Sequence, residues 1–517
     1  MEQNFSPADI NVFRKRNISL EKIASQFYFF QNGIPKINLI RPAKINDGIL
    51  ILSKIRAQEY ANVFNGQKHK YKLLKFVPAS GAASRMFKFL SAFLNDFKIE
   101  QESISDYIQR HKDRNLESFF TSLTKFPFYA EVSNEVQKLL KTDSTHNSDA
   151  TNYAFVKTLL SQNHFDFGSK PKAILPFYRA NGIVFTAIDA HLKECIAYGM
   201  SNNKANLHFT VSKEHQSEFE RIVSKFKSEN NSSVEIDVSY SYQCQSTDVL
   251  AYTANKIPFR DQDGNLVFRP GGHGALIENL NQLDADLIFI KNVDNVIQSQ
   301  SDAQTLYKKA LAGILIENQN IVFKCIAILK KGTVSDKDFS EIISFLSSKL
   351  FIKLVQNFSM FSATEKVDYL LNLLNRPIRV CGMVKNEGEA GGGPYWVSDN
   401  LGMETLQIIE TVQVDRANLL QNEILFKATH FNPVDVVCGI KNSDGFKFNL
   451  LDFVDHSTGF IVEKTKNGVA YQALELPGLW NGAMAKWLTI FVEVPITTFN
   501  PVKTVNDLLK PAHQSVN

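Results

Sequence analysis

The chain has 517 residues, 44% of them apolar, so more than one folding unit is expected, because single cores rarely grow beyond about 300 residues. Lys and Arg (57) nearly balance Asp and Glu (53), which leaves a net charge of +4. A field this weak argues against polymeric nucleic acid or an anionic membrane as the main partner. A small anion could still be bound by a few local cations.

The five cysteines are far apart and form no C-x-x-C pair: Cys195, Cys244, Cys325, Cys381 and Cys438. An odd, dispersed set favours reduced structural thiols over a disulfide framework or a zinc site. The first residues contain no apolar segment of the kind that a signal peptide needs. No window approaches eighteen continuous apolar residues, so we predict no membrane span and a soluble, cytoplasmic protein.

The first recognisable element after a predicted helical N-terminal extension (residues 1–70) is a short buried strand, Leu73–Val77. It runs directly into the small-residue loop Pro78–Ser84. After the loop, apolar residues recur at helical spacing: Met86, Phe89, Leu90, Phe93, Leu94 and Phe97. The loop is therefore a strand-to-helix turn.

The middle of the chain alternates between predicted strands and helices. Residues 98–165 are polar and helical in character, and we predict that they form an insertion. Alternating apolar residues then predict strands at 207–211 and 234–238, with a helix at 219–226 between them. Strand, helix and strand at this spacing favour a βαβ unit and a largely parallel sheet.

The rest of the chain completes an α/β core. A further buried strand is predicted at Leu287–Ile290, and residues 301–375 are predicted to be a second helical insertion. Segments after 376 are β-rich. We therefore predict one α/β core, at 71–300 and 376–517, that carries two helical insertions.

Two loops and one strand end carry candidate chemistry. Small residues at 80–84 would let backbone N–H groups approach a phosphate, which Arg85 could also bind. Gly271–Gly274 could lie flat against a ligand. Asp294, after a buried strand, could hold Mg²⁺ on a triphosphate. The alternatives are tight helix–strand packing, an ordinary strand-to-helix turn and an Asx turn, respectively.

In this order, these segments resemble the UDP-sugar pyrophosphorylases. The first loop follows the frame A-G-G-x-G-T-R-M of that family: Ala79, Ser80, Gly81, Ala82, Ala83, Ser84, Arg85 and Met86. The second resembles P-x-G-[HN]-G: Pro270, Gly271, Gly272, His273 and Gly274. Phe289–Asn295 is similar to V-x-N-x-D-N, Phe499–Thr504 to F-x-P-[VL]-K-[TN], and Lys170–Pro176 to the basic segment of the wider fold. The resemblance covers about 71–90, 168–300 and 376–510, and it implies a nucleotide-binding core at 71–300 and a sugar-binding, C-terminal part of that core at 376–517.

The resemblance implies a Rossmann-like α/β fold of the nucleotide-diphospho-sugar transferase (GT-A) type. Such a fold has a mixed, mostly parallel sheet, here with helical insertions and a β-rich C-terminal part. The implied activity is transfer of a nucleoside monophosphate, UMP in this family, from a nucleoside triphosphate to a sugar 1-phosphate, with release of pyrophosphate and with Mg²⁺ or Mn²⁺ as cofactor. A bacterial branch separate from the UDP-glucose and UDP-N-acetylhexosamine enzymes is expected.

Roles carried over from the resemblance fall into three groups. Arg85 would meet the β- and γ-phosphates, Lys172 the α-phosphate and Lys503 the sugar phosphate, while Asp294 would bind the metal. The nucleotide would lie on the backbone of residues 80–84 and on Gly271, Gly272, His273 and Gly274, with Gln243 reading the base. The sugar pocket would contain Asn295, Glu410, Asn432 and Glu475.

The first loop departs from the family pattern at Ser80 and Ala83, which replace glycines. An alanine at a position that needs positive φ would cost about 1 kcal/mol or more. A sugar-nucleotide binder without turnover is therefore an alternative, and a GT-A type glycosyltransferase is another. A dinucleotide dehydrogenase is disfavoured because no G-x-G-x-x-G follows a strand. The sequence does not determine the base, the sugar or the oligomeric state.

Overall fold

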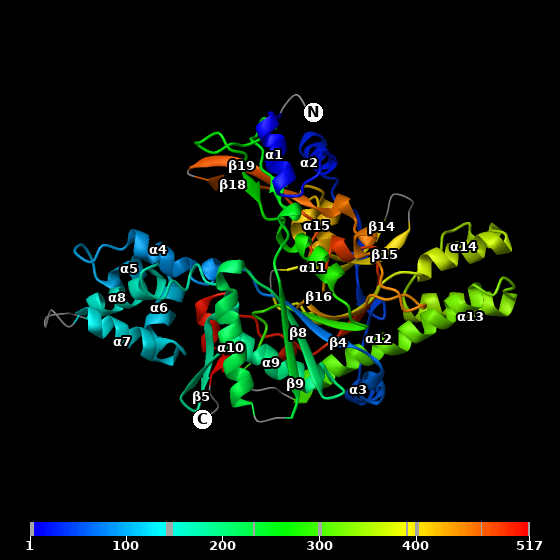
Figure 1. Cartoon of the computed structure of the whole chain (residues 1–517), viewed down its shortest axis with the longest axis horizontal. Coiled ribbons are helices and arrows are strands. Elements are labelled where there is room, and N and C mark those ends of the chain that lie inside the picture. The colour runs from blue at the N-terminus through cyan, green and yellow to red at the C-terminus, as the bar shows by residue number, and fades with distance from the viewer. Residues whose placement is uncertain are drawn as a thin grey trace. The chain divides into compact units, whose positions relative to one another are not determined.

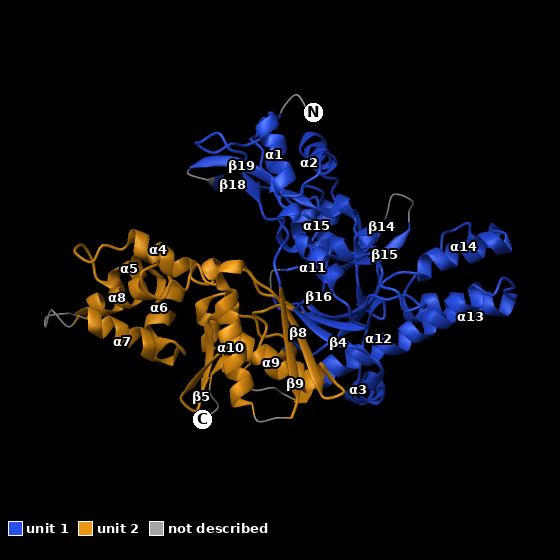
Figure 2. Cartoon of the chain, viewed as in Figure 1, with its two compact units in different colours: residues 1–76, 241–290, 306–496 blue, residues 77–240, 291–305, 497–517 orange. Residues whose placement is uncertain are grey.

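The computed structural model (Figure 1) describes residues 5–140, 148–230, 233–297, 302–388, 391–398, 403–466 and 468–514. The chain forms two compact units, each built from three chain segments (Figure 2). Unit 1 consists of Met1–Phe76, Ser241–Ile290 and Leu306–Ile496. Unit 2 consists of Val77–Tyr240, Lys291–Thr305 and Thr497–Asn517.

Unit 1 contains most of the strands. Its helices are α1 (Pro7–Lys15), α2 (Leu20–Asn32), α3 (Lys54–Gln67), α11 (Leu276–Gln282), α12 (Asp302–Leu329, which begins in unit 2), α13 (Asp336–Lys349), α14 (Ala363–Leu374) and α15 (Leu419–Phe426). Its strands are β1 (Leu39–Pro42), β2 (Lys44–Ile45), β3 (Gly48–Leu50), β4 (Leu73–Pro78, ending in unit 2), β10 (Val249–Leu250), β11 (Phe268–Arg269), β12 (Leu287–Lys291, ending in unit 2), β13 (Ile378–Lys385), β14 (Gly393–Ser398), β15 (Glu404–Ile409), β16 (His430–Phe431), β17 (Asp435–Gly439), β18 (Phe460–Lys466), β19 (Val469–Glu475) and β20 (Leu488–Glu493).

The main sheet of unit 1 is mixed. Its strands follow the order β2-β3-β20-β13-β17-β12-β4. The pairs β2–β3, β3–β20, β20–β13 and β12–β4 are parallel, whereas β13 and β17 are antiparallel. β12 and β13 are buried along almost their whole length, as expected for strands that have both faces covered.

Helix α12 is long and apolar enough to cross a membrane by length and composition. However, 61% of its most apolar window is buried inside the structure, as in the core helix of a globular protein. Gln319 on this helix lies against Gly439 of β17, where an added Cβ would be 2.4 Å from Gln319 Nε2. We therefore interpret α12 as a core helix of unit 1.

Unit 2 combines a helical group with a smaller α/β part. Its helices are α4 (Lys88–Asp96), α5 (Ile104–His111), α6 (Arg114–Thr121), α7 (Tyr129–Leu140), α8 (Ser148–Leu160), α9 (Ala187–Tyr198) and α10 (Gln216–Glu229). Its strands are β5 (Pro176–Ala180), β6 (Ile183–Thr186), β7 (Met200–Ser201), β8 (Lys204–Thr210) and β9 (Glu235–Ser241, whose last residue belongs to unit 1).

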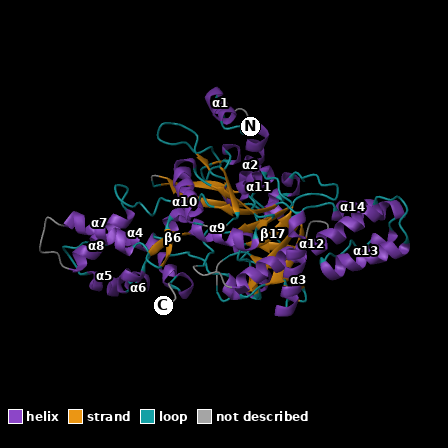
Figure 3. Ribbon diagram, turned by 60° about the horizontal axis from the view of Figure 1, so that its bottom comes forward, coloured by secondary structure: helices purple, strands orange, loops and turns teal. Residues whose placement is uncertain are grey.

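Helices α4 to α8 lie together as a group without strands (Figure 3), around an aromatic core. Phe93 is central to this core, stacking on Phe97 at 4.9 Å between ring centroids and meeting Tyr107 edge-on at 5.4 Å. In the α/β part, β8 pairs with both β7 and β9, and its residues Leu207 and Phe209 share one hydrophobic core with residues of α9 and α10.

The prediction of a mixed α/β protein is confirmed at this level. The strands expected at 73–77 and 287–290 are β4 and β12, and the helix expected at 219–226 lies within α10. One expectation differs in detail. Residues 39–50, expected within a helical extension, contain the short strands β1 to β3. On β8, the polar residues His208 and Thr210 are buried, as their apolar neighbours are. The domain limits and the GT-A topology remain predictions.

Candidate active site

The first small-residue loop lies in unit 2 and is fixed at both ends by backbone contacts. Ala79 N donates to Thr210 O at 3.0 Å, at the end of β8. Ala83 N donates to Lys170 O at 2.9 Å, and Lys172 N donates to Gly81 O at 3.2 Å. The loop therefore lies directly beside the predicted basic segment, Lys170–Pro176.

The loop conformation tolerates the two residues that depart from the family pattern. None of residues 80–84 has positive φ, so Ser80 and Ala83 carry none of the strain considered above. A Cβ added at Gly81 would have no atom within 4 Å, so its backbone borders open space. The α-helix begins only at Lys88, after the short 3-10 turn Ala83–Arg85, so Arg85 is exposed three residues before the helix.

Lys172 joins two further predicted segments. Its Nζ donates to Asp294 Oδ2 at 2.8 Å and to the backbone oxygen of Val502 at 2.7 Å. The side chains of Lys172 and Asp294 are only 15% and 20% exposed. Their attraction is screened less than that of a surface pair. One ammonium group therefore links the strand end after β12 with the C-terminal segment.

Backbone contacts also hold these two segments together. Val502 N donates to Asp294 O at 3.0 Å, and Asn500 N donates to Asn295 Oδ1 at 2.8 Å. Asn295 is 1% exposed, so this contact gives it a structural role next to Asp294. Its role in sugar binding, which the sequence resemblance implies, remains a prediction.

Lys503 is exposed and follows directly after Val502. Asp507 fixes the local backbone, because its Oδ2 accepts from Lys503 N at 2.9 Å and from Thr504 N at 2.6 Å. Burial raises the pKa of Asp507, but hydrogen bonds from Lys510 and Thr504 outweigh it and leave this pKa below its ordinary value. The T-x-x-D capping pattern at 504–507 is a sequence signal that could have identified Asp507.

A metal at this site would have to use Asp294. Among the described residues, no group of three or more His, Cys, Asp or Glu side chains is close enough together to hold an ion. A single carboxylate suits Mg²⁺, which commonly binds one or two carboxylates and completes its shell with phosphate oxygens and water. The donor set therefore fits a metal that arrives with a triphosphate.

The second glycine loop belongs to unit 1, and atoms of the same unit occupy the space beside its glycines. An added Cβ would lie 2.6 Å from Thr247 O at Gly271 and 2.5 Å from Pro477 O at Gly274. At Gly272, where φ is +67°, it would lie 2.5 Å from Glu475 Oε2. Close packing on residues 475–477 thus accounts for these glycines. His273 faces Trp480, with ring centroids 5.0 Å apart.

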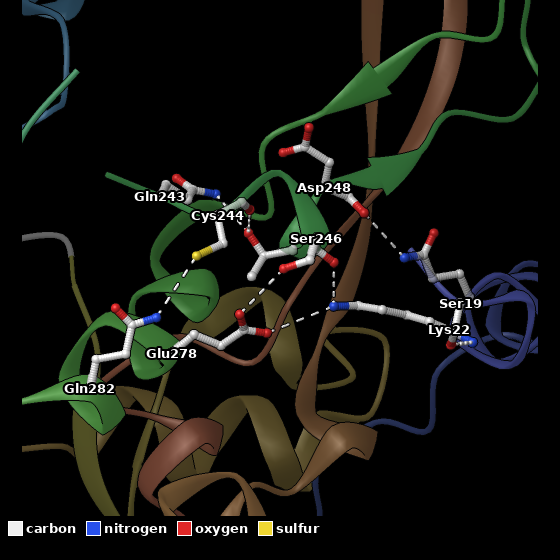
Figure 4. A network of polar contacts seen from close by, with 10 residues as sticks. Ser19, Lys22, Gln243, Cys244, Ser246, Asp248, Glu278 and Gln282 are labelled. Carbon is white, nitrogen blue, oxygen red and sulfur yellow. Dashed lines mark hydrogen bonds and ion pairs between the residues drawn. The ribbon is translucent and has the colours of Figure 1, made fainter. Parts of the chain in front are cut away.

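Gln243 lies in a polar network of unit 1 (Figure 4). Its Nε2 is 3.5 Å from Thr247 Oγ1, at the outer limit of a hydrogen bond. Lys22 on α2 donates to Ser246 O at 2.6 Å and lies 3.9 Å from Glu278. Residues 1–70, to which the sequence assigned no chemistry, therefore hold the segment that carries Gln243.

The predicted sugar residues of unit 1 are linked in part. Asn481 Nδ2 donates to Glu410 Oε1 at 2.7 Å, and Asn432 N donates to Gly392 O at 2.8 Å. A Cβ at Gly392 would be 3.6 Å from Asn481 Oδ1. Glu475 instead accepts from Lys464 Nζ at 2.9 Å. Asn481 was missed because no pattern in the sequence connects it with Glu410.

The predicted site residues thus fall into two sets. Unit 2 contains the loop at 80–84, Arg85, Lys172, Asp294, Asn295 and Lys503, and it joins the segments that carry them through the contacts above. Unit 1 contains Gln243, Gly271, Gly272, His273, Gly274, Glu410, Asn432 and Glu475. The assigned roles remain predictions.

Comparison with known proteins gives one family and several similar structures. Residues 6–514 match the model of the family described as "Domain of unknown function (DUF4301)". The uridine diphosphate N-acetylglucosamine pyrophosphorylase from Trypanosoma brucei is similar, with 10% identity, a TM-score of 0.48 and coverage of 98% of this chain and 79% of that one. The UDP-glucose pyrophosphorylase from Leishmania major has 12% identity, a TM-score of 0.43 and coverage of 97% and 77%. No curated protein matches by sequence.

Proposed function

The chain belongs to the family described as "Domain of unknown function (DUF4301)", and from the residues of unit 2 we propose that it is a nucleotidyltransferase. It would transfer a nucleoside monophosphate, UMP, from a nucleoside triphosphate to a sugar 1-phosphate and release pyrophosphate. One observation carries the proposal: Lys172 Nζ contacts both Asp294 Oδ2 and Val502 O. These three residues come from three separate segments: those of Asp294 and Val502 resemble pyrophosphorylase motifs, and that of Lys172 resembles the basic segment of the wider fold.

The reaction needs positioning and charge stabilisation rather than a covalent intermediate. An oxygen of the sugar phosphate attacks the α-phosphorus, and the bond to pyrophosphate breaks as the new bond forms. Lys172 would stabilise charge on the α-phosphate, in a partly dehydrated position where an ammonium group is most effective. The exposed Arg85 would bind the outer phosphates, and Lys503 would bind the phosphate of the sugar substrate.

Asp294 is the residue that would hold a divalent cation. Bound Mg²⁺ or Mn²⁺ would neutralise charge on the phosphates. In the free chain Lys172 and Asp294 neutralise each other at 2.8 Å. Each would find an opposite charge in a metal–triphosphate complex, so the pair is suited to exchange one partner for another.

The test is pyrophosphate release from a panel of nucleoside triphosphates and sugar 1-phosphates with Mg²⁺ or Mn²⁺. We expect release with UTP, and its loss in Lys172→Met and Asp294→Asn. The matched controls Lys98→Met and Asp96→Asn change exposed residues of α4 and its C-terminal flank in unit 2, and should keep wild-type rates. Absence of release with every pair would contradict the proposal.

A binder without turnover is the alternative that the sequence left open, because Ser80 and Ala83 stand where the UDP-sugar pyrophosphorylases have glycines. It predicts that UTP or a UDP-sugar raises the thermal stability of the chain while no pyrophosphate appears. Both measurements on the same sample separate the two functions.

A further inference from the structure

Helix α9 presents a row of buried polar side chains to the turn that carries Asp294. His191, Glu194 and Tyr198 follow at spacings of three and four residues, so they share one face of the helix. Their side chains are buried, with residue exposures of 0%, 2% and 3%. The helix itself is fixed by a capping box between Thr186 and Asp189. These residues belong to unit 2, and the reaction assigned above uses none of them.

Glu194 is the centre of this row. It accepts from Lys291 Nζ at 2.6 Å through Oε1 and from Tyr198 OH at 3.0 Å through Oε2. The side chains of Lys291 and Glu194 are only 2% and 3% exposed. Lys291 is the last residue of β12, three positions before Asp294. The start of the Asp294 turn is therefore tied to α9 by a fully buried ion pair.

His191 fixes the same turn nearer to Asp294. Its Nε2 lies 3.1 Å from the backbone oxygen of Val293, the residue before Asp294. A carbonyl oxygen can only accept, so this ring nitrogen carries the proton and donates. Its Nδ1 lies 3.8 Å from Glu194 Oε2, so the two α9 residues are neighbours.

Stability by itself is a poor explanation for this arrangement. A buried ion pair is often no more stabilising than apolar residues of the same volume, because both charges lose their hydration. What the contacts do achieve is to fix Lys291 and Val293 from the α9 side. Val502 N, which donates to Asp294 O at 3.0 Å, fixes the turn from another side. The backbone of Asp294 is thus held by two separate parts of unit 2.

We propose that His191 and Glu194 are positioning residues that orient the Asp294 carboxylate toward Lys172 and toward a divalent cation. Neither side chain touches substrate in this proposal; both act through the backbone and through Lys291. The inference rests on the proposed function for the role of Asp294. Residues of this kind behind a metal-binding carboxylate typically change metal affinity about 10- to 100-fold.

The test compares His191→Phe, which removes the donor and keeps a ring, with His191→Gln, which keeps an N–H donor. Tyr198→Phe removes only the hydroxyl that supports Glu194. Mn²⁺ binding to the full chain is measured by calorimetry with and without UTP, next to the Mn²⁺ dependence of pyrophosphate release. We expect His191→Phe to weaken Mn²⁺ binding about tenfold. His191→Gln should stay near wild type, and Tyr198→Phe should show a smaller change in the same direction.

Three results would overturn the inference: wild-type Mn²⁺ affinity in His191→Phe, equal weakening in His191→Gln and His191→Phe, or a wild-type chain that binds no Mn²⁺ with or without UTP. The proposed function fails in a different way. In that case wild type and variants bind Mn²⁺ in the expected order, but no sugar 1-phosphate supports release of pyrophosphate.

Discussion

The two candidate phosphate loops look alike in the sequence and differ in what surrounds them. Both follow a strand and precede a helix. In unit 1, a Cβ at Gly271 or Gly274 would come within 2.6 Å of backbone oxygens of the same unit. In unit 2, a Cβ at Gly81 would have no atom within 4 Å. Atoms of unit 1 occupy the space beside the glycines at 271–274, which we call the filled loop. The loop at 80–84 borders open space at Gly81, and we call it the open loop.

The difference shows that a glycine-rich loop has two distinct physical causes. Glycine allows a close approach of backbone, whether the approaching group is a ligand or another part of the chain. At 271–274 the approaching group is the segment 475–477, which is sufficient to explain the residues. At 80–84 no such group explains Gly81, which contacts Lys172 only through the backbone, Lys172 N donating to Gly81 O at 3.2 Å. The predictions below separate these two causes.

The largest effect is expected where charge, not packing, is removed from unit 2. Asp294→Ala and Lys503→Ala should each lower turnover by at least about 100-fold, the scale of a lost transition-state charge contact. Circular dichroism and thermal unfolding should stay close to wild type for the exposed Lys503. Near-normal rates in both variants would show that the Lys172–Asp294 region is not the active site. The open space beside Gly81 would then be no evidence for nucleotide binding.

A stability effect is expected from the filled loop. Gly274→Ala would place a methyl group 2.5 Å from Pro477 O and 2.8 Å from the backbone carbon of Leu476, neither of which can move cheaply. Overpacking of this kind costs about 2 kcal/mol. The matched control is Gly66→Ala on α3, where a Cβ meets nothing within 4 Å. Thermal unfolding should show a fall of several degrees in the first variant only. An unchanged unfolding temperature in Gly274→Ala would contradict the packing explanation and favour a ligand-binding role for this loop.

A substitution in the open loop should weaken binding of UTP and leave the thermal stability of the chain unchanged. Gly81→Ala adds a methyl group where we expect phosphate oxygens to approach the backbone, and φ is not positive there. The Kd for UTP should rise about tenfold, which corresponds to about 1.4 kcal/mol. Calorimetry with UTP measures this. Gly168→Ala, also in unit 2 with only an ordinary 3.8 Å contact, is the control. Equal UTP affinity in wild type and Gly81→Ala would mean that the loop does not touch the nucleotide.

Long or periodic elements of the fold could be predicted from the sequence, and short ones could not. β4 and β12 are uninterrupted apolar runs, and α10 shows a clear helical period. By contrast, β1 to β3 have two to four residues each, too few to show a period. The burial of the polar residue His208 on β8 could not be predicted, because its hydrogen-bond partner, Ser239 at 2.8 Å, lies on another strand.

The site was predictable only as far as motifs extend. The motifs indicated that Lys172, Asp294 and the segment after Phe499 belong together, and the contacts place them within one unit. The residues that support the site could not be predicted from the sequence. His191 meets Val293 across 102 positions, and Asn481 meets Glu410 across 71. A buried polar residue gives no local pattern, since its identity is set by a partner that only the folded chain brings near.

The smallest effect concerns the N-terminal helices that support the region of the filled loop in unit 1. Asp9 on α1 accepts from Arg260 at 2.8 and 3.0 Å, and these hydrogen bonds, opposed by burial, lower the pKa of Asp9 to about 2. A carboxyl group whose pKa is lower in the folded chain than in the unfolded chain, where it is about 3.9, stabilises the fold at pH values above 3.9. This contribution to the free energy of unfolding is lost as the pH falls from about 4 to 2. Because Arg260 is 38% exposed, we expect about 1 kcal/mol at pH 6.

Asp9→Asn tests this contribution directly. The variant should unfold at a lower temperature than wild type at pH 6. This difference in unfolding temperature, the gap, should narrow as the pH falls below 4, because wild-type Asp9 then becomes protonated and loses its charge. Thermal unfolding over this pH range measures the gap. Pyrophosphate release should be affected only through stability, in contrast to Asp294→Ala. A gap that stays constant with pH would mean that the Asp9–Arg260 charge pair does not stabilise unit 1. Packing alone would then hold α1 in place, as it does the filled loop.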